Sequence, residues 1–287
     1  MDDERRPKLA SDNYGKSGIR LVKVVRDGPR HTLHDLTVDV RVEGDFLAAH
    51  LGGDNSSVLP TDTMKNTVYA LARTHDVDPP ERFCGVVGAH VLESSPNASR
   101  VTVEIARHGW GRIAVGGRPH ETAFERGSAE ARVACVSTAR GGPSVTEAGV
   151  RDLIVLRTAG SAFSGFPRDE FTTLRETRDR VFATTIASRW TYRTDAGSHN
   201  TAFVAVRRAL VEMFATHVSE SVQHTLYAMG EAALVACADI EEIRLSMPNK
   251  HHLLVDLAAF GLENPNEIFV ATTEPYGLIE ATLSRGE

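Results

Sequence analysis

Cysteine is scarce in this chain, and its shortage excludes several kinds of protein. Of 287 residues only three are cysteines, and no Cys-x-x-Cys motif occurs. Cys84, Cys135 and Cys237 are far apart and odd in number. A small scaffold held together by disulfides and a cysteine-based zinc module are therefore excluded, and we expect buried thiols in a reducing, cytoplasmic setting.

Long apolar runs and an excess of positive charge are also missing. No stretch of about 18 apolar residues occurs, so no membrane span is expected. Lysine and arginine total 32 against 38 acidic residues, which leaves a net charge of −6. Such a balance lacks the basic footprint of a nucleic-acid-binding domain. Five of the first six residues are charged, and this segment lacks the apolar core of a secretory signal.

What is present is the composition of an ordinary globular protein. The chain is 41% hydrophobic and 24% charged. Its length suits one large domain or two domains of about 140 residues each.

The first half of the chain predicts strands on either side of two helices. Residues 36–43 alternate strictly between apolar and polar, as a half-buried strand does. An apolar run over 19–25 precedes them, and Gly28-Pro29 lies between the two, so we expect an antiparallel hairpin. Helical spacing follows at Met64, Val68 and Leu71, and again at Phe83, Val87 and Val91. Strands are expected near 101–105 and 131–136, with a glycine-rich connection over 109–117 and a linker over 139–145.

The second half repeats this order. Strands are expected at 153–156 and 186–192, and helices at 203–214 and 222–237, with Ser219 as the cap between them. Further strands are expected at 243–247, at 253–257 after an interruption by Pro248, and at 268–271.

Together the halves predict an α+β protein of two tandem ββααββ units, 1–145 and 146–287. The repeat is one of element order only, because the halves show no obvious residue identity. We expect antiparallel sheets with helices on one face. A sheet covered on one side only is a candidate for closing into a barrel with neighbouring copies, so a homo-oligomer is expected.

Three segments carry candidate chemistry, and each also has an ordinary structural interpretation. Lys16 is either a surface lysine or a desolvated general base. Thr61 is either a helix cap, with Asp62 in the first turn, or a hydroxyl that relays a proton. His251 and His252 are neighbours on an expected strand, where adjacent side chains point to opposite faces. They therefore do not readily share a metal ion, and no Cys/His set has zinc spacing.

Other candidates lie in charged or glycine-rich stretches. Arg180 ends a charged run and could grip a planar anion with its forked donors. Gln223 lies in the first turn of an expected helix, and Phe163 lies within a Gly/Ser loop. Residue chemistry alone does not choose between these roles and simple surface or core positions.

The segments taken together resemble the urate oxidase (uricase) family. The motifs that carry the resemblance are Tyr14-Gly15-Lys16, Thr61 to Thr67, Gly160 to Phe166, Asp169 to Arg180, Ser221-Val222-Gln223 and Pro248-Asn249-Lys250-His251. They span about 14–283, and their order and spacing are highly specific as a set.

The resemblance implies a fold and a reaction. The fold is the tunnelling fold, in which four chains build a barrel pierced by a central tunnel, with active sites between subunits. The reaction is the oxidation of urate by O2 and water to 5-hydroxyisourate and hydrogen peroxide, with no cofactor and no metal. Such an enzyme serves purine catabolism.

The resemblance also implies a role for each matching residue. Lys16, Thr61 and His251 form a proton relay, and Lys16 and Thr61 of one chain face the purine pocket of its neighbour. Arg180, Gln223 and the backbone amide of Val222 clamp one edge of urate. Phe163 stacks on the ring, and Leu174, Thr61 and Asp62 supply the remaining contacts. Asn249 and Thr61 form the site that holds O2 and then water.

Two departures from the family pattern and two alternatives remain. His252 stands where the family more often has an aromatic residue, and we expect little effect because it faces away from His251. The chain ends Ser-Arg-Gly-Glu rather than Ser-Lys-Leu, which favours a bacterial cytoplasmic enzyme over a peroxisomal one.

A zinc-dependent tunnelling-fold enzyme acting on pterins or GTP is the first alternative. A non-enzymatic homologue that only assembles or binds purines is the second.

Overall fold

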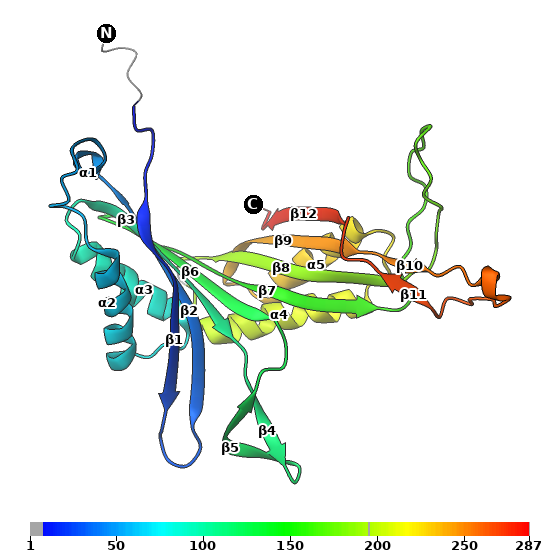
Figure 1. Cartoon of the computed structure of the whole chain (residues 1–287), viewed down its shortest axis with the longest axis horizontal. Coiled ribbons are helices and arrows are strands. Elements are labelled where there is room, and N and C mark those ends of the chain that lie inside the picture. The colour runs from blue at the N-terminus through cyan, green and yellow to red at the C-terminus, as the bar shows by residue number, and fades with distance from the viewer. Residues whose placement is uncertain (1–7, 195, 287) are drawn as a thin grey trace, which may run out of the picture. The chain divides into compact units, whose positions relative to one another are not determined.

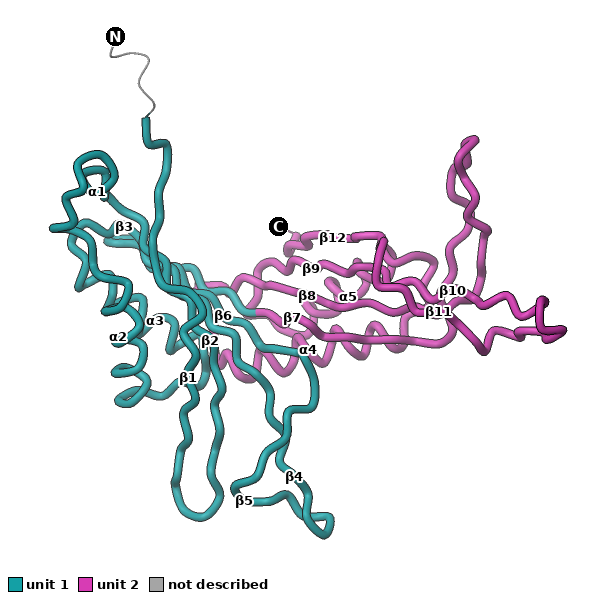
Figure 2. Tube along the Cα trace, viewed as in Figure 1, with its two compact units in different colours: residues 1–148 teal, residues 149–287 magenta. Residues whose placement is uncertain are grey.

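The computed structural model describes residues 8–194 and 196–286. The chain divides into two compact units, Met1–Ala148 (unit 1) and Gly149–Glu287 (unit 2), coloured separately in Figure 2. The first six residues, which are not expected to form a secretory signal, lie outside the described residues. Within the described ranges no helix is long and apolar enough to cross a membrane.

Unit 1 contains a sheet of long strands backed by two helices, as Figure 1 shows. Its sheet order is β1-β2-β3-β6, and each neighbouring pair is antiparallel. The elements are β1 (Tyr14–Val25), β2 (Thr32–Gly44), α1 (Leu47–Gly52), α2 (Thr61–Thr74), α3 (Pro80–Glu93), β3 (Ala98–His108), β4 (Gly111–Val115), β5 (Arg118–Glu125) and β6 (Ala131–Ala139).

The core of unit 1 follows from the alternation seen in the sequence. Leu36, Val38, Val40 and Val42 of β2 are all 0% exposed, while the residues between them lie on the opposite face. The buried residues of α2 and α3, which include Met64 and Phe83, pack into the same cluster. The predicted hairpin and both predicted helices of this half are confirmed.

Unit 2 repeats this architecture with the sheet order β7-β8-β9-β12. Its helices α4 and α5 pack together, and α5 packs against β9 and β12. The elements are β7 (Val145–Arg157), β8 (Phe182–Tyr192), α4 (His199–Thr216), α5 (Val222–Ala236), β9 (Ile240–Lys250), β10 (His252–Leu254), the 3₁₀ helix η2 (Ala258–Phe260), β11 (Phe269–Ala271) and β12 (Gly277–Ser284). The prediction of two tandem ββααββ units is confirmed, and each unit carries a short extra hairpin (β4-β5 or β10-β11) before its last strand.

A residue-level correspondence between the units emerges only in the structure. Arg140 follows the last strand of unit 1 and donates to the carbonyls of Ala98, Leu92 and Ser95, at 2.8, 2.6 and 2.9 Å. Arg285 follows the last strand of unit 2 and bonds the carbonyls of Leu234, Cys237 and Ile240. Both arginines thus satisfy carbonyls at and beyond the end of the second helix of their unit. The expectation that the halves share element order alone was wrong at this position.

Three other local expectations were also wrong. Pro248 does not interrupt its strand, because β9 continues to Lys250 and Pro248 pairs with Leu278. The glycine-rich connection over 109–117 contains β4, and it leads directly into β5. The final strand is β12, which had not been predicted, and the strand expected over 253–257 is only the short β10.

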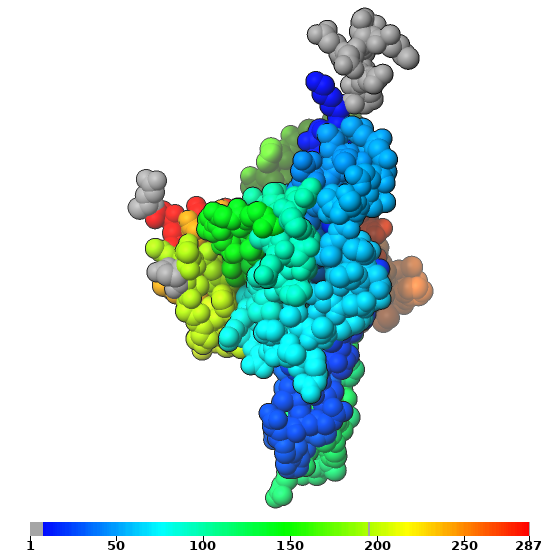
Figure 3. Space-filling view, turned by 90° about the vertical axis from the view of Figure 1, so that its left-hand side faces the viewer, coloured from blue at the N-terminus to red at the C-terminus, as the bar shows by residue number. Residues whose placement is uncertain are grey.

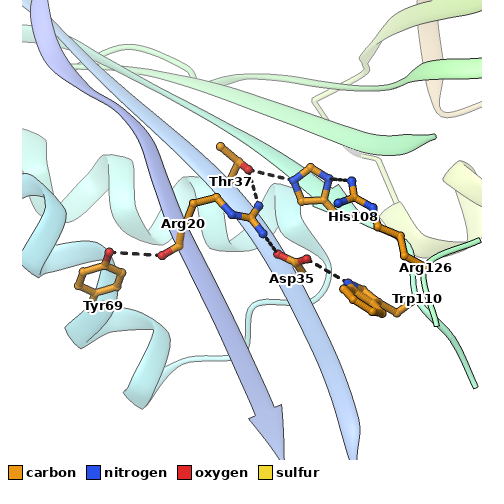
Figure 4. A network of polar contacts seen from close by, with 7 residues as sticks. All are labelled: Arg20, Asp35, Thr37, Tyr69, His108, Trp110 and Arg126. Carbon is orange, nitrogen blue, oxygen red and sulfur yellow. Dashed lines mark hydrogen bonds and ion pairs between the residues drawn. The ribbon is translucent and has the colours of Figure 1, made fainter. Parts of the chain in front are cut away.

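The β4-β5 hairpin is tied to the β1-β2 hairpin, beside which it lies in Figures 1 and 3. The N–H of His31 donates to the carbonyl of Glu121 at 3.1 Å. Nearby, the 4% exposed Asp35 accepts bonds from the Arg20 guanidinium and from the Trp110 indole, the latter at 3.0 Å. Figure 4 shows the whole network, which comprises Arg20, Asp35, Thr37, Tyr69, His108, Trp110 and Arg126.

Candidate active site

A cavity of about 430 Å³ lies in unit 2, lined by residues of the β7-β8 connection, the end of β9 and the β10-β11 hairpin. It contains four of the predicted site residues: Leu174, Arg180, Asn249 and His251. The other lining residues are Thr158, Arg175, Thr177, Asp179, Val181, His252, Leu253, Leu254, Asn266 and Phe269.

Arg180 is a half-buried charged group of this cavity that has no counter-ion among the described residues. It lies just before β8 and is half-buried, and burial lowers the pKa of its guanidinium. No carboxylate of the described residues forms an ion pair with it, and the adjacent Asp179 instead accepts a hydrogen bond from the N–H of Gly160 at 2.7 Å. A half-buried arginine without a counter-ion is suited to bind an anion that brings its own charge.

Phe163 lies beside Arg180 and is held there by its backbone. The guanidinium carbon of Arg180 is 5.4 Å from the centre of the Phe163 ring, which also stacks on Phe166 with centroids 5.0 Å apart. The N–H and carbonyl of Phe163 exchange hydrogen bonds with Thr177 at 2.8 and 3.0 Å. The aromatic side chain is therefore fixed on the loop rather than plugged into the core of unit 2.

The loop that carries Phe163 is also fastened to the start of α5. The N–H of Ala162 donates to the carbonyl of Ser219 at 2.7 Å, and the N–H of Ser219 donates to Gly160 at 3.1 Å. Ser219 is not the helix cap that we predicted, because Ser221 fills this role and accepts a bond from the N–H of His224.

Val222 and Gln223 are consequently the first two residues of α5. Backbone N–H groups in the first turn of a helix have no partner within the helix and favour an anion. Val222 is buried and can offer only its backbone, whereas the Gln223 side chain is exposed. Neither residue lines the cavity itself.

Both histidines line the cavity, which corrects the expectation that they face opposite ways. His251 lies between β9 and β10 rather than inside a strand, so strand alternation does not apply to the pair. Its carbonyl accepts the N–H of Thr272 at 2.9 Å. The Nδ1 of His252 lies 3.2 Å from the carbonyl of Lys250, and this nitrogen must carry the hydrogen because a carbonyl only accepts.

Lys16, Thr61 and Asp62 lie together within unit 1. Lys16 pairs with Val40 just before a bulge in β1. Thr61 is the first residue of α2 and does not cap it, because the cap position belongs to Pro60. The prediction of a Thr61 cap was therefore wrong. Asp62 is exposed, and its pKa is lowered mainly by Lys65, with a smaller contribution from the charge of Lys16.

Sequence reasoning missed several residues of the cavity. Asp179 and Thr177 lie in the charged run that ends at Arg180, and that run was the available signal. Asn266 and Phe269 come from the β10-β11 region, where no sequence pattern marked them. Within residues 8–194 and 196–286, no three His, Cys, Asp or Glu side chains gather as a metal site.

Comparison with known proteins relates the whole chain to one family. The family model described as Uricase matches residues 12–137 and 146–280. The chain is 43% identical to the uricase of Arthrobacter globiformis over 277 residues, covering 96% of this chain and 90% of that protein. It is 36% identical to the Aspergillus flavus uricase over 287 residues, covering 95% of each.

Solved structures agree with the sequence comparison. The crystal structure of the Arthrobacter globiformis uricase superposes with a TM-score of 0.92 at 43% identity, covering 98% of this chain and 96% of that one. A urate oxidase from Bacillus sp. TB-90 has a TM-score of 0.85 at 21% identity, covering 96% and 100%. The second likeness supports the fold alone.

Proposed function

This chain belongs to the uricase family, and we propose that its residues divide the oxidation of urate among a clamp, a proton relay and an oxygen site. Its activity is that of an oxidoreductase that oxidises urate. Urate, O2 and water give 5-hydroxyisourate and hydrogen peroxide, so two electrons pass from the purine to O2.

The observation that carries the proposal is the half-buried Arg180 without a carboxylate partner. Urate is a planar anion, and a guanidinium can meet one of its edges with two parallel N–H donors. Gln223 supplies an amide that both donates and accepts, and the N–H of Val222 adds a further donor. Phe163 stacks on the ring and Leu174 forms a wall of the pocket.

The relay removes a proton from bound urate. Lys16 acts as the base, Thr61 passes the proton through its hydroxyl, and His251 ends the relay. Deprotonation matters because urate itself must reduce O2, and removing a proton makes urate more electron-rich. The protein therefore promotes the reaction mainly by raising the negative charge on the substrate. The support for this step is the family motif together with the closeness of Lys16 to the start of α2.

Asn249 is proposed to hold O2, and then water, above the ring, with Thr61 beside it. An amide side chain offers two donors and a carbonyl oxygen, so it can bind either molecule in turn. Asn249 lines the same cavity as Arg180 and His251, which is consistent with this role.

We further propose a homotetramer in which Lys16, Thr61 and Asp62 of one subunit complete the unit 2 pocket of another, within a barrel that has a central tunnel. Large apolar side chains lie exposed near the pocket, as expected of a surface that another chain covers. Leu253, Leu254, Val270 and Leu278 are 56%, 49%, 51% and 58% exposed.

A cytoplasmic location is also proposed, and the three free cysteines support it.

Urate consumption by metal-stripped protein in air tests the function. The expected result is loss of the ultraviolet absorbance of urate together with formation of hydrogen peroxide. No loss of absorbance would contradict the proposal. Activity that disappears when a chelator is added would favour the zinc-dependent alternative.

A further inference from the structure

One arginine, Arg157, joins the end of β7 to both the Phe163 loop and the end of α4. Its guanidinium donates to four carbonyl oxygens: Ala159 at 2.9 Å, Gly160 at 2.5 Å, Phe214 at 3.2 Å, and His217. The first two acceptors open the loop that carries Phe163. The last two lie at the end of α4, where helix carbonyls lack partners.

Gly160 is the point at which this arginine acts on the loop. Its carbonyl accepts from both Arg157 and the N–H of Ser219, and its own N–H donates to Asp179 at 2.7 Å. Its φ of +74° suits glycine, and a Cβ at this position would collide with the Arg157 guanidinium. Arg157 and Gly160 therefore form one interlocked turn.

From this turn a short chain of hydrogen bonds reaches the urate clamp. Ser219 holds Ala162, and Thr177 holds Phe163, whose ring lies 5.4 Å from the guanidinium carbon of Arg180. Ser219 also precedes Ser221, the cap of the helix that begins with Val222 and Gln223. A displaced Gly160 would thus loosen the ring that stacks on urate and also the first turn of α5.

We propose that Arg157 is a positioning residue for urate binding, which it supports by locking Gly160 and, through it, Phe163 and the start of α5. It contacts neither cavity nor substrate. The inference rests on the proposed function of Phe163 and Arg180 as the clamp. Only arginine has a planar fork of five N–H donors that reaches several carbonyls at once, whereas lysine offers three donors at one point.

The test compares Arg157→Met with Arg285→Met. Arg285 is a matched control, because it also bonds three carbonyls near a helix end in unit 2 but is not linked to the Phe163 loop. Both variants should lower the thermal midpoint. Only Arg157→Met should raise the KM for urate, by about tenfold, while kcat stays within about twofold of wild type. The same variant should raise the Kd for xanthine, a planar purine, by about tenfold when binding is measured by calorimetry. Arg157→Lys should fall between Arg157→Met and the wild type.

Hydrogen–deuterium exchange separates this inference from the function itself. Segment 160–166 should exchange faster in Arg157→Met than in the wild type, and it should be unchanged in Arg285→Met. This readout needs no urate, so a wild-type chain that failed to oxidise urate would contradict the function and leave the positioning role measurable. The proposal would be overturned if segment 160–166 exchanged at the wild-type rate in Arg157→Met. It would also be overturned if this variant had a lowered thermal midpoint but KM and Kd within about twofold of wild type. If Arg157→Met does not fold, Arg157→Lys carries the same comparison.

Discussion

At the residue scale, the site depends on charged groups whose partners inside the chain are absent or used elsewhere. Arg180 has no carboxylate partner among the described residues, and Asp179 is turned toward Gly160. The cost of half-burying Arg180 is therefore not offset by any carboxylate of the described residues, and an anion that enters the cavity can offset it. Such a group is expected to serve binding rather than stability.

Arg180→Ala should therefore damage urate binding. We expect KM to rise about ten- to a hundredfold, because hydrogen bonds to charged groups contribute about 1.5–3 kcal/mol. Arg180→Lys should recover only part of this, since an ammonium does not bind an edge bidentately. The control is Arg178→Ala, which lies in the same charged run but is exposed and outside the cavity. Steady-state kinetics on urate measure all three, and equal KM values for the Arg178 and Arg180 variants would remove Arg180 from the clamp.

Lys16→Met should impair turnover far more than binding. If Lys16 is the base, kcat should fall about 10²- to 10⁴-fold while KM changes little. Lys23→Met is the matched control on the same strand, where the lysine donates to the carbonyl of His75 at 2.8 Å. Single-turnover and steady-state rates with urate give the comparison. Near-normal kcat in Lys16→Met would show that another group takes the proton.

At the element scale, polar side chains join strands to neighbouring hairpins and helix ends. In unit 1 the Asp35 network joins β1 and β2 to the approach of the β4-β5 hairpin (Figure 4). In unit 2 Arg157 joins β7 to α4. In both places a polar side chain links segments that are distant along the chain.

Asp35→Asn should weaken unit 1 modestly. The ion pair with Arg20 is lost, but Arg20 is 51% exposed and remains solvated, so we expect a loss of about 1 kcal/mol in the free energy of unfolding. Urea unfolding measures the change. Asp27→Asn, in the exposed β1-β2 turn, should change stability by less than about 0.5 kcal/mol. A loss no larger than that of Asp27→Asn would show that the network adds nothing to stability.

His34 should make unit 1 less stable in mild acid. Burial on β2 lowers its pKa below the usual 6.5, so the folded chain keeps the ring neutral. The charges that act on it are those of Arg107, Asp78, Lys23 and Asp76, of which the two carboxylates oppose the shift. Between the lowered pKa and 6.5 the unfolded chain binds a proton that the folded chain excludes, so stability falls as the pH drops through this window.

The measurement is the urea midpoint at about pH 7.5 and about pH 5.5 for the wild type and for His34→Gln. The wild type should lose more stability between these values than the variant does. Equal losses in the two proteins would show that His34 does not cause the acid sensitivity.

At the scale of the whole molecule, we propose that each site takes residues from two subunits. Lys16 and Thr61 belong to unit 1, whereas Arg180, Asn249 and His251 belong to unit 2. If a site takes these halves from different subunits, then a variant impaired in turnover and a variant impaired in binding should complement each other.

Lys16→Met and Arg180→Ala chains, unfolded together and refolded as a mixture, should regain activity. With equal amounts and random assembly, about a quarter of the sites receive Lys16 from one variant and Arg180 from the other. The assay uses urate well below the wild-type KM, where each variant refolded alone is the control and should keep only a small fraction of wild-type activity. Activity that remains at the level of the separate variants would show that a single chain supplies both residues.

Local patterns by themselves determined much of this protein. The alternation of Leu36 to Val42 predicts β2, and helical spacing from Met64 and from Phe83 predicts α2 and α3. These predictions succeed because an element buried on one face repeats its apolar residues with the period of a strand or a helix. The family motifs also named Arg180, Asn249 and His251. The periodic patterns are local, so a single segment suffices to recognise them, whereas the family motifs are specific only as a set.

Only the tertiary structure decided how distant backbone groups meet. That Pro248 continues β9, that His251 and His252 share one cavity, and that Ser221 rather than Ser219 caps α5 all depend on neighbouring strands and loops. The four acceptors of Arg157 are carbonyls that any residue could supply, so no side-chain pattern marks them. Backbone hydrogen bonds between remote segments cannot be recognised from side-chain patterns in the sequence, and here they hold the Phe163 loop in place.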